Sequence, residues 1–131
     1  MTVRYLNPDT LHRPFDGMYS HVSQTSATTF FRIGGQVAVD REGASLALGD
    51  MAGQIRACYD CVTGALESVG IGWPNVTHIL TFTTDMDSYL RHEQEIARQY
   101  FGDTPPPSTL VAVPRLVQPE WLVEVQVDAA A

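Results

Sequence analysis

The two cysteines are the first residues whose spacing could support chemistry. They stand as Cys58-Tyr59-Asp60-Cys61, and two thiols separated by two residues can form a redox pair or half of a zinc site. A zinc site requires two further ligands, but the sequence contains no second pair of this kind and its four histidines lie far apart. The thiols also fall in the middle of an expected helix, whereas redox pairs stand at helix starts, where the thiolate is stabilised. We therefore interpret both cysteines as packing residues.

Lysine is missing from the chain. All eight basic residues are arginines, set against fifteen acidic residues, which gives a formal charge of −7. Lysine chemistry on carbonyls or pyridoxal phosphate is thereby excluded, as is a standard P-loop. The negative charge also argues against nucleic acid as a partner. Because no apolar run approaches the roughly 18 residues of a membrane span and no signal peptide is evident, we expect no membrane partner and a cytoplasmic location.

Two segments show the periodicity of amphipathic helices, at residues 50–69 and 87–101. Apolar residues in the first recur at steps of three and four, which makes one stripe along the helix. Asp50 can cap the start and Gly70 the end of this helix, while Asp87 can cap the start of the second. We expect the second helix to turn these residues inward: Leu90, Ile96, Ala97, Tyr100 and Phe101.

The rest of the chain is predicted to form strands. β-branched and apolar residues make 76–83 typical of a central strand, and 19–25 and 28–34 are typical of the two arms of a hairpin. Further strands are expected at 3–5, 36–39, 108–113 and 122–128. With 131 residues, 44% of them apolar, the chain can bury one core. We therefore predict one domain over residues 1–131, with an α+β layout in which two helices cover one face of a sheet.

The last predicted strand has two unlike faces. Val123, Val125 and Val127 alternate with a second set of residues, Leu122, Glu124, Gln126 and Asp128. The valine face must pack on the helices, and two helices cannot also cover the other face. Either water or another subunit covers it. Exposed apolar residues on the other strands favour a subunit; we expect these to be Phe30, Phe31, Val111 and Val113.

Several segments together resemble the RidA superfamily, also called the YjgF/YER057c/UK114 family. They are Tyr19, Ile33-Gly34-Gly35-Gln36-Val37, 51–70, 76–86, Tyr100-Phe101-Gly102-Asp103, 106–113 and Leu122-Val123-Glu124-Val125. Their order and spacing cover nearly the whole chain. The resemblance implies a chorismate-mutase-like fold and a homotrimer, in which three sheets form a central barrel with clefts between subunits. Many members hydrolyse small enamines and imines in these clefts, with neither cofactor nor metal.

One motif of the deaminating members is changed. They carry Pro-x-Arg-Ser/Thr before the penultimate strand, and the arginine holds the substrate carboxylate through paired donors. Here the segment reads Pro105-Pro106-Pro107-Ser108-Thr109, which places Ser108, or Pro107 with another gap, at the arginine position. Arg115 lies beyond the strand and matches a different, non-catalytic arginine of the family. We therefore expect little activity on 2-iminopropionate.

The resemblance also implies a set of site residues. Glu124 matches the acid/base glutamate, which could orient or protonate a water that attacks an imine carbon. Tyr19 matches a cleft tyrosine, and Gly35 matches a glycine whose backbone approaches the ligand. Ser108 and Thr109 supply hydroxyls where the carboxylate clamp would be. Glu124, Tyr19 and Gly35 also have purely structural interpretations, Ser108 and Thr109 could bind a neutral ligand, and the roles of His21, Gln94, Trp121 and Arg115 stay open.

Two functional hypotheses follow for this divergent RidA-type chain. One is a cofactor-free hydrolase or deaminase of a small enamine or imine, with Glu124 activating water. The alternative is a trimer that binds a small molecule, or acts as a scaffold, without imine deaminase activity. Some family members are called ribonucleases or translation inhibitors, but the charge of −7 argues against a strong RNA binder.

Overall fold

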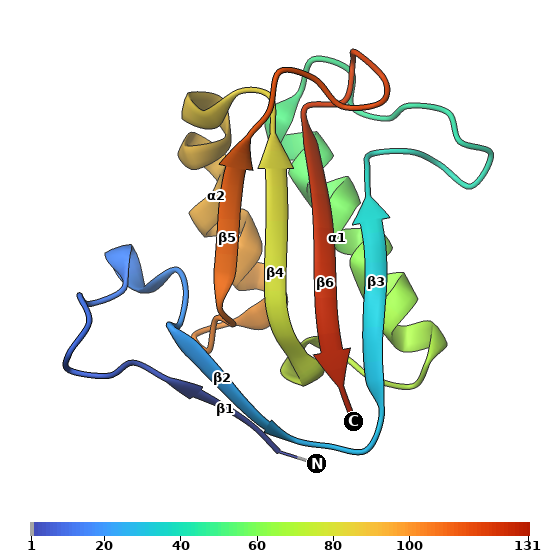
Figure 1. Cartoon of the computed structure of the whole chain (residues 1–131). Coiled ribbons are helices and arrows are strands. Elements are labelled where there is room, and N and C mark those ends of the chain that lie inside the picture. Colours follow the sequence, from blue (N-terminus) through green and yellow to red (C-terminus); the bar gives the residue numbers. More distant parts are fainter. Residues whose placement is uncertain (1) are drawn as a thin grey trace.

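The computed structural model describes residues 2–131, in which two helices cover one face of a four-stranded sheet (Figure 1). The elements are β1 (Thr2–Leu6), η1 (Phe15–Gly17), β2 (Val22–Ser26), β3 (Phe30–Gln36), α1 (Met51–Ser68), η2 (Trp73–Asn75), β4 (Val76–Thr83), α2 (Met86–Phe101), β5 (Ser108–Ala112) and β6 (Val123–Ala130). The predicted α+β class, the order of the helices among the strands and the placement of both helices on one face are confirmed.

The main sheet has the strand order β3-β6-β4-β5. β4 and β5 run parallel because α2 crosses over between them, whereas β6 is antiparallel to both of its neighbours. β4 lies between β6 and β5 and spans the predicted residues 76–83, so its prediction as a central strand is confirmed. β3 and β5 form the two edges of this sheet.

The predicted hairpin between 19–25 and 28–34 is wrong. β2 pairs with β1 in a separate two-stranded ribbon, and β3 pairs with β6, where Phe30 is opposite Ala130. The short connection between β2 and β3 turns the chain toward the C-terminus, because Thr28 and Thr29 donate from their backbones to the carbonyl oxygen of Ala131. Apolar packing explains the choice: Ile33 of β3 is buried in the core, whereas β2 is largely polar.

The start and end of α1 follow the sequence prediction. The Asp50 side chain accepts a hydrogen bond from the backbone N–H of Gly53 at 3.0 Å. Gly70, just beyond the C-cap, has a φ of +78°, which lies in the left-handed region that glycine adopts readily. Both residues therefore act as the spacing predicted.

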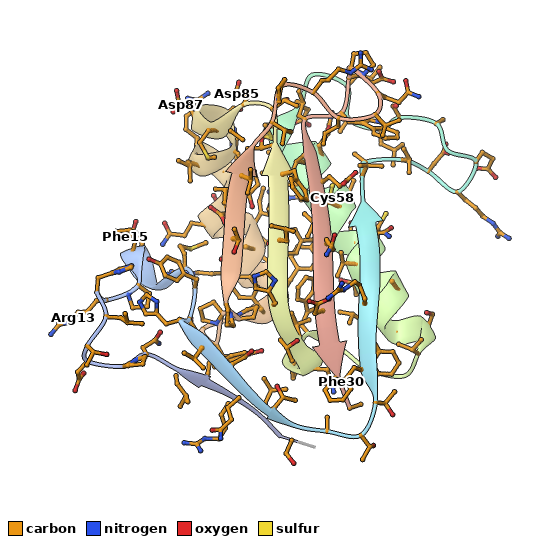
Figure 2. The ribbon with its side chains drawn as sticks, in the orientation of Figure 1. Arg13, Phe15, Phe30, Cys58, Asp85 and Asp87 are labelled. Carbon is orange, nitrogen blue, oxygen red and sulfur yellow. The ribbon has the colours of Figure 1, made fainter. Side chains whose placement is uncertain are left out.

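The start of α2 differs from the prediction. Asp85, rather than Asp87, is the N-cap, because its side chain accepts from the backbone N–H of Ser88 at 3.1 Å. Both carboxylates lie at the same end of the helix (Figure 2). Tyr89 is buried, whereas Leu90, expected to face inward, is 54% exposed and lines a cavity beside β5. The other residues expected to face inward from α2 are buried or packed against the core.

The core lies between the helices and one face of the sheet. Val123, Val125 and Val127 of β6 are fully buried with Ile55 and Leu66 of α1, which confirms that the valine face packs on the helices.

Neither helix in residues 2–131 is long and apolar enough to cross a membrane.

The opposite face of the sheet carries no helix within the described chain (Figure 1). Glu124 and Asp128 of β6 lie there and are partly exposed. Phe30, which lies at the start of β3 (Figure 2), is 73% exposed, and Val111 is also exposed. Phe31, expected on this face, packs against the core instead, because it shares the inward parity of Ile33. The covering of this face by another subunit stays a prediction.

Candidate functional site

The Glu124 carboxylate lies directly beside the backbone of Gly35. The pairing of β3 with β6 shifts between Ile33 and Gln36, which creates a bulge that contains Gly34 and Gly35. A Cβ atom at Gly35 would lie 2.6 Å from Oε2 and 2.7 Å from Cδ of Glu124. Glycine at this position therefore makes room for the carboxylate. Gly35 is thus a bulge glycine beside the candidate acid/base group, and the approach of its backbone to a ligand stays a prediction.

Tyr19 and Ser108 lie elsewhere, in a cavity of about 340 Å³ beside β5. Residues from η1, α2 and β5 and the segment that follows η1 line this cavity. Its apolar lining residues are Phe15, Met18, Leu90 and Leu110, and its polar lining residues are Asp16, Tyr19, Glu93, Gln94 and Ser108. Gln94, whose role the sequence left open, thus lies beside two of the predicted site residues. The volume falls in the range of small-molecule sites, about 300 to 1,000 Å³.

A cluster of rings holds the Tyr19 side chain in place. The Tyr19 hydroxyl and Nε2 of His12 share a hydrogen bond of 2.7 Å. His21 Nε2 donates to the carbonyl oxygen of His12 at 2.6 Å, and the His21 backbone donates to the Asn7 side chain. The His12 ring also stacks on Phe15, with ring centroids 5.0 Å apart. His12 was not identified by the sequence analysis, and His21 is engaged in holding the backbone of this loop.

Thr109 faces away from Ser108. Successive residues of a strand alternate between the faces of the sheet, and the side chains of Ser108 and Leu110 lie on the helix side. The Thr109 hydroxyl lies 3.4 Å from Nε2 of His78, a residue of the neighbouring strand β4. The structure therefore does not bring Thr109 into the polar set around Tyr19 and Ser108.

Four of the five predicted site residues form two groups within one chain, and Thr109 belongs to neither. Glu124 and Gly35 belong to β6 and β3, while Tyr19 and Ser108 lie beside β5, and β4 separates β6 from β5 in the sheet. The first group lies on the face without helices, and the second adjoins α2. The resemblance implied a single site, so these two groups are each only part of the predicted constellation.

Glu93 is a further carboxylate of the cavity that the sequence analysis did not identify. Burial raises the pKa of its carboxyl group, and a hydrogen bond with Tyr89 lowers it in part. The residue lies four positions after buried Tyr89 and three before buried Ile96, which places it on the inward stripe of α2. An acidic residue on an otherwise apolar stripe was the available signal in the sequence.

Cys58 packs in the core as the sequence predicted, and the partly exposed Cys61 lies beside the backbone of Val37. Cys58 is buried on α1 behind the sheet (Figure 2), with Sγ 3.6 Å from the carbonyl oxygen of Val123. Burial raises the pKa of both thiols, the reverse of what a reactive thiolate requires. Among residues 2–131, no group of three or more histidine, cysteine or acidic side chains is close enough to hold a metal ion.

Two other residues with open roles are engaged in local contacts. Trp121 donates from Nε1 to the hydroxyl of Ser45 at 3.0 Å. The Arg115 guanidinium donates to the carbonyl oxygens of Leu116 and Val117 in its own loop. Neither residue lines the cavity beside β5, so the structure does not bring Arg115 or Trp121 to Ser108 and Tyr19 within one chain.

Known proteins similar to this chain share its fold over most of its length. A RutC family protein of Pyrococcus horikoshii is 27% identical over 113 residues, which are 86% of each protein. The crystal structure of YyfB of Yersinia pestis, a Rid family protein of unknown function, covers all of both chains with a TM-score of 0.92 at 23% identity. A putative endoribonuclease of Thermotoga maritima covers 86% of each chain, with a TM-score of 0.71 and 26% identity. Since the Endoribonuclease L-PSP family model matches residues 10–131, this chain belongs to that family, and thus to the RidA superfamily.

Proposed function

We propose that the protein is a cofactor-free hydrolase of small imines or enamines that do not depend on an arginine-held carboxylate. The observation that carries this proposal is the Glu124 carboxylate beside the bulge backbone at Gly35, on a face of the sheet without helices. A partly exposed carboxylate next to backbone that no side chain covers can position a water molecule and exchange a proton with it. Membership of the superfamily and the resemblance of both residues to its site support the assignment.

The proposed reaction requires only water and one carboxylate. Water adds through its oxygen to the imine carbon, Glu124 accepts the proton that the water loses, and the glutamic acid passes this proton to the imine nitrogen, which gives a carbinolamine. Glu124 then removes the hydroxyl proton of the carbinolamine as the C=O bond forms and the C–N bond breaks, and it delivers that proton to the departing nitrogen. An imine and water thus become a carbonyl compound and ammonia, with no change in oxidation state. General acid–base help of this kind contributes about 10² to 10⁴ in rate.

We place the complete site between subunits of a homotrimer. Within one chain, the Glu124–Gly35 pair and the cavity that holds Tyr19 and Ser108 lie on different sides of β4. Contact between copies could bring the pair of one subunit opposite the cavity of its neighbour. The exposed Phe30 on the open face of the sheet supports such a contact, because burial of a large apolar side chain favours association.

The substrate class follows from Ser108. A hydroxyl at the family's arginine position cannot form the paired, charge-assisted hydrogen bonds that a planar guanidinium forms with a carboxylate. Each such bond contributes about 1.5–3 kcal/mol. Imines derived from amino acids are therefore expected to be poor substrates, and imines without a carboxylate are expected to be better ones.

The test compares two classes of imine. An amino-acid oxidase generates 2-iminopropionate in place, and an amine oxidase generates imines without a carboxylate. Semicarbazide traps either imine, and a hydrolase that competes for it lowers the initial rate of semicarbazone formation. We expect competition with the second class, lost in Glu124→Gln and retained in Glu67→Gln, which removes an exposed carboxylate on α1. Equal competition by the wild type and Glu124→Gln would exclude the proposed chemistry.

A role in binding without turnover is the second candidate. The change from arginine to Ser108 favours it, because this change removes the group that holds the ordinary substrate of the family. If no imine is hydrolysed, yet a ligand binds the wild type and Glu124→Gln equally, the protein is a binder. Cleavage of RNA by the wild type would instead favour the activity after which the family model is named.

A further inference from the structure

The cavity beside β5 has the charge of a site for cations. Two carboxylates, Asp16 and Glu93, are among its lining residues. No arginine or histidine lines it within the described chain, and the sequence has no lysine. The other polar lining residues, Tyr19, Gln94 and Ser108, are neutral hydrogen-bonding groups. An anionic ligand would therefore meet two like charges and no counter-charge inside this cavity.

Glu93 is the more informative of the two carboxylates. It is partly buried on the inward side of α2, and no residue in the described part of the chain forms an ion pair with it. Removal of a carboxylate from water is unfavourable unless a positive group or hydrogen-bond donors replace the lost solvent. Tyr89 provides one hydrogen bond. A positively charged ligand in the cavity would provide the missing counter-charge.

The two arginines near the cavity do not neutralise its carboxylates. Arg98 lies one turn beyond Gln94 on α2, and its Nη2 atom donates to the backbone carbonyl oxygen of Asp16 at 2.8 Å. Arg91 and Arg98 line a neighbouring groove of α2 rather than this cavity. Arg91, Arg98 and Asp16 are all exposed to solvent, which screens their charges, so the partly buried Glu93 is the least screened of these groups.

The apolar residues that line the cavity favour a ligand with an apolar group. Phe15, Met18, Leu90 and Leu110 provide apolar contact, and the exposed Phe15 projects from η1, as Figure 2 shows. Aromatic rings also attract cations over their faces, by about 0.5–1 kcal/mol at exposed positions. A ligand with one apolar group and one charged nitrogen would therefore match both the apolar and the acidic parts.

We propose that this cavity binds a small organic amine, or the iminium ion derived from one, with the charged nitrogen toward Glu93 and the apolar body toward Phe15 and Leu90. This inference rests on the proposed function, because the bound cation is a substrate only if the protein hydrolyses imines. It names small organic iminium ions as the substrate class of that function. An iminium carbon accepts water more readily than a neutral imine carbon. A carboxylate that favours the charged form therefore favours hydrolysis as well.

The experiment measures equilibrium binding of three probes of similar size to the full-length protein by calorimetry. The probes are 2-phenylethylamine, which is a cation at neutral pH, 2-phenylethanol, which is neutral, and phenylacetate, which is an anion. We expect the amine to bind about tenfold more tightly than the alcohol, and phenylacetate to bind more weakly than either. Tighter binding of phenylacetate than of the amine, or no binding of any probe, would overturn the proposal.

Two variants locate the charge that is responsible. Glu93→Gln keeps the shape of the side chain and removes its charge, so we expect the affinity for the amine to fall to that for the alcohol. Glu95→Gln removes an exposed carboxylate of the same helix outside the cavity and leaves all three affinities unchanged. If Glu93→Gln fails to fold, Asp16→Asn on the exposed η1 turn removes the other carboxylate of the cavity, with an expected loss of several-fold in affinity for the amine. Unchanged affinity for the amine in either folded variant would contradict the assignment.

Amine binding tests the cation site, and imine hydrolysis tests the proposed reaction, so the two proposals can fail separately. If the amine binds as expected but Glu124→Gln has no effect on any imine, the proposed reaction fails and the cation site stands. If imines without a carboxylate are hydrolysed with dependence on Glu124 while the amine does not bind, the reaction stands and the cation site fails.

Discussion

The Glu124–Gly35 pair and the cavity beside β5 are built in different ways. The pair depends on the main chain: a bulge in β3 sets the position of Gly35, and any side chain there would meet the carboxylate. The cavity depends on side chains contributed by η1, α2 and β5. A single substitution can therefore change the charge of the cavity without a change in the fold, whereas the pair is constrained by backbone geometry.

This difference agrees with the departure that the resemblance to the superfamily predicts. By that resemblance, Glu124 and Gly35 match the family pattern, whereas Ser108, which lies in the cavity, takes the position of the arginine. The part of the molecule that we expect to activate water is thus the constrained one. The part that we expect to select the substrate is the one that is free to change.

Gly35→Ala tests the constrained region and should have the largest effect. The new Cβ would lie 2.6 Å from Oε2 of Glu124, so the end of this flexible side chain has to move away. We expect imine turnover to fall about 100-fold, as for loss of a general base, with little change in Tm. Gly34→Ala is the matched control, since a Cβ at that residue would meet no heavy atom within 4 Å beyond its chain neighbours. Equal turnover in the two alanine variants would show that the close approach has no catalytic meaning.

Ser108→Arg tests the variable region. An arginine at this position restores paired donors for a carboxylate and neutralises part of the acidic charge of the cavity. We expect competition for 2-iminopropionate in the semicarbazide assay to increase about tenfold or more, and affinity for 2-phenylethylamine to fall. Ser108→Gln, which adds length without charge, should produce neither change. If Ser108→Arg leaves the preference among imines unaltered, the cavity does not select the substrate.

Phe30→Glu tests whether the two regions meet across an interface. Phe30 is 73% exposed on the face that carries Glu124, and a charge at this position would oppose burial against a second copy. We expect the variant to shift from trimer toward smaller species in analytical ultracentrifugation, with several-fold lower turnover. Val117→Glu, at a similarly exposed residue in the loop before β6, should keep the wild-type mass. A wild type that sediments as a monomer would refute the shared site.

The sequence predicted those elements whose signals are local. The alternation in β6 gave both its buried and its open face, and the caps of α1 were found from Asp50 and Gly70. Strand pairing is not local. The hairpin prediction failed because Ile33 is buried in the core, where β3 pairs with β6 instead of β2. The cap of α2 was placed two residues late because Asp85 and Asp87 are equally good caps by type.

The candidate site was predictable only where single residues matched the resemblance. Sequence spacing gave no indication that the Glu124–Gly35 pair and the cavity lie on different sides of β4, since this depends on the strand order. Glu93 was missed although its place on the apolar stripe of α2 was a signal, because burial alone shows its importance, and His12 was missed because only its contact with Tyr19 distinguishes it. Their roles arise from tertiary structure.

The contact between Tyr19 and His12 gives the smallest expected effect and refines the description of the cavity. A double-mutant cycle with Tyr19→Phe and His12→Phe keeps the ring packing and removes the shared hydrogen bond of 2.7 Å. Because both residues are near solvent, we expect a coupling of about 0.5–1 kcal/mol in the free energy of unfolding, measured with urea. We expect the affinity of Tyr19→Phe for 2-phenylethylamine to fall only two- to threefold, because the charge of Glu93 remains. Additive effects in the cycle would mean that packing alone holds Tyr19. A loss of affinity above tenfold would mean that the hydroxyl itself binds the ligand, in which case the cavity recognises its ligand through Tyr19 more than through its charge.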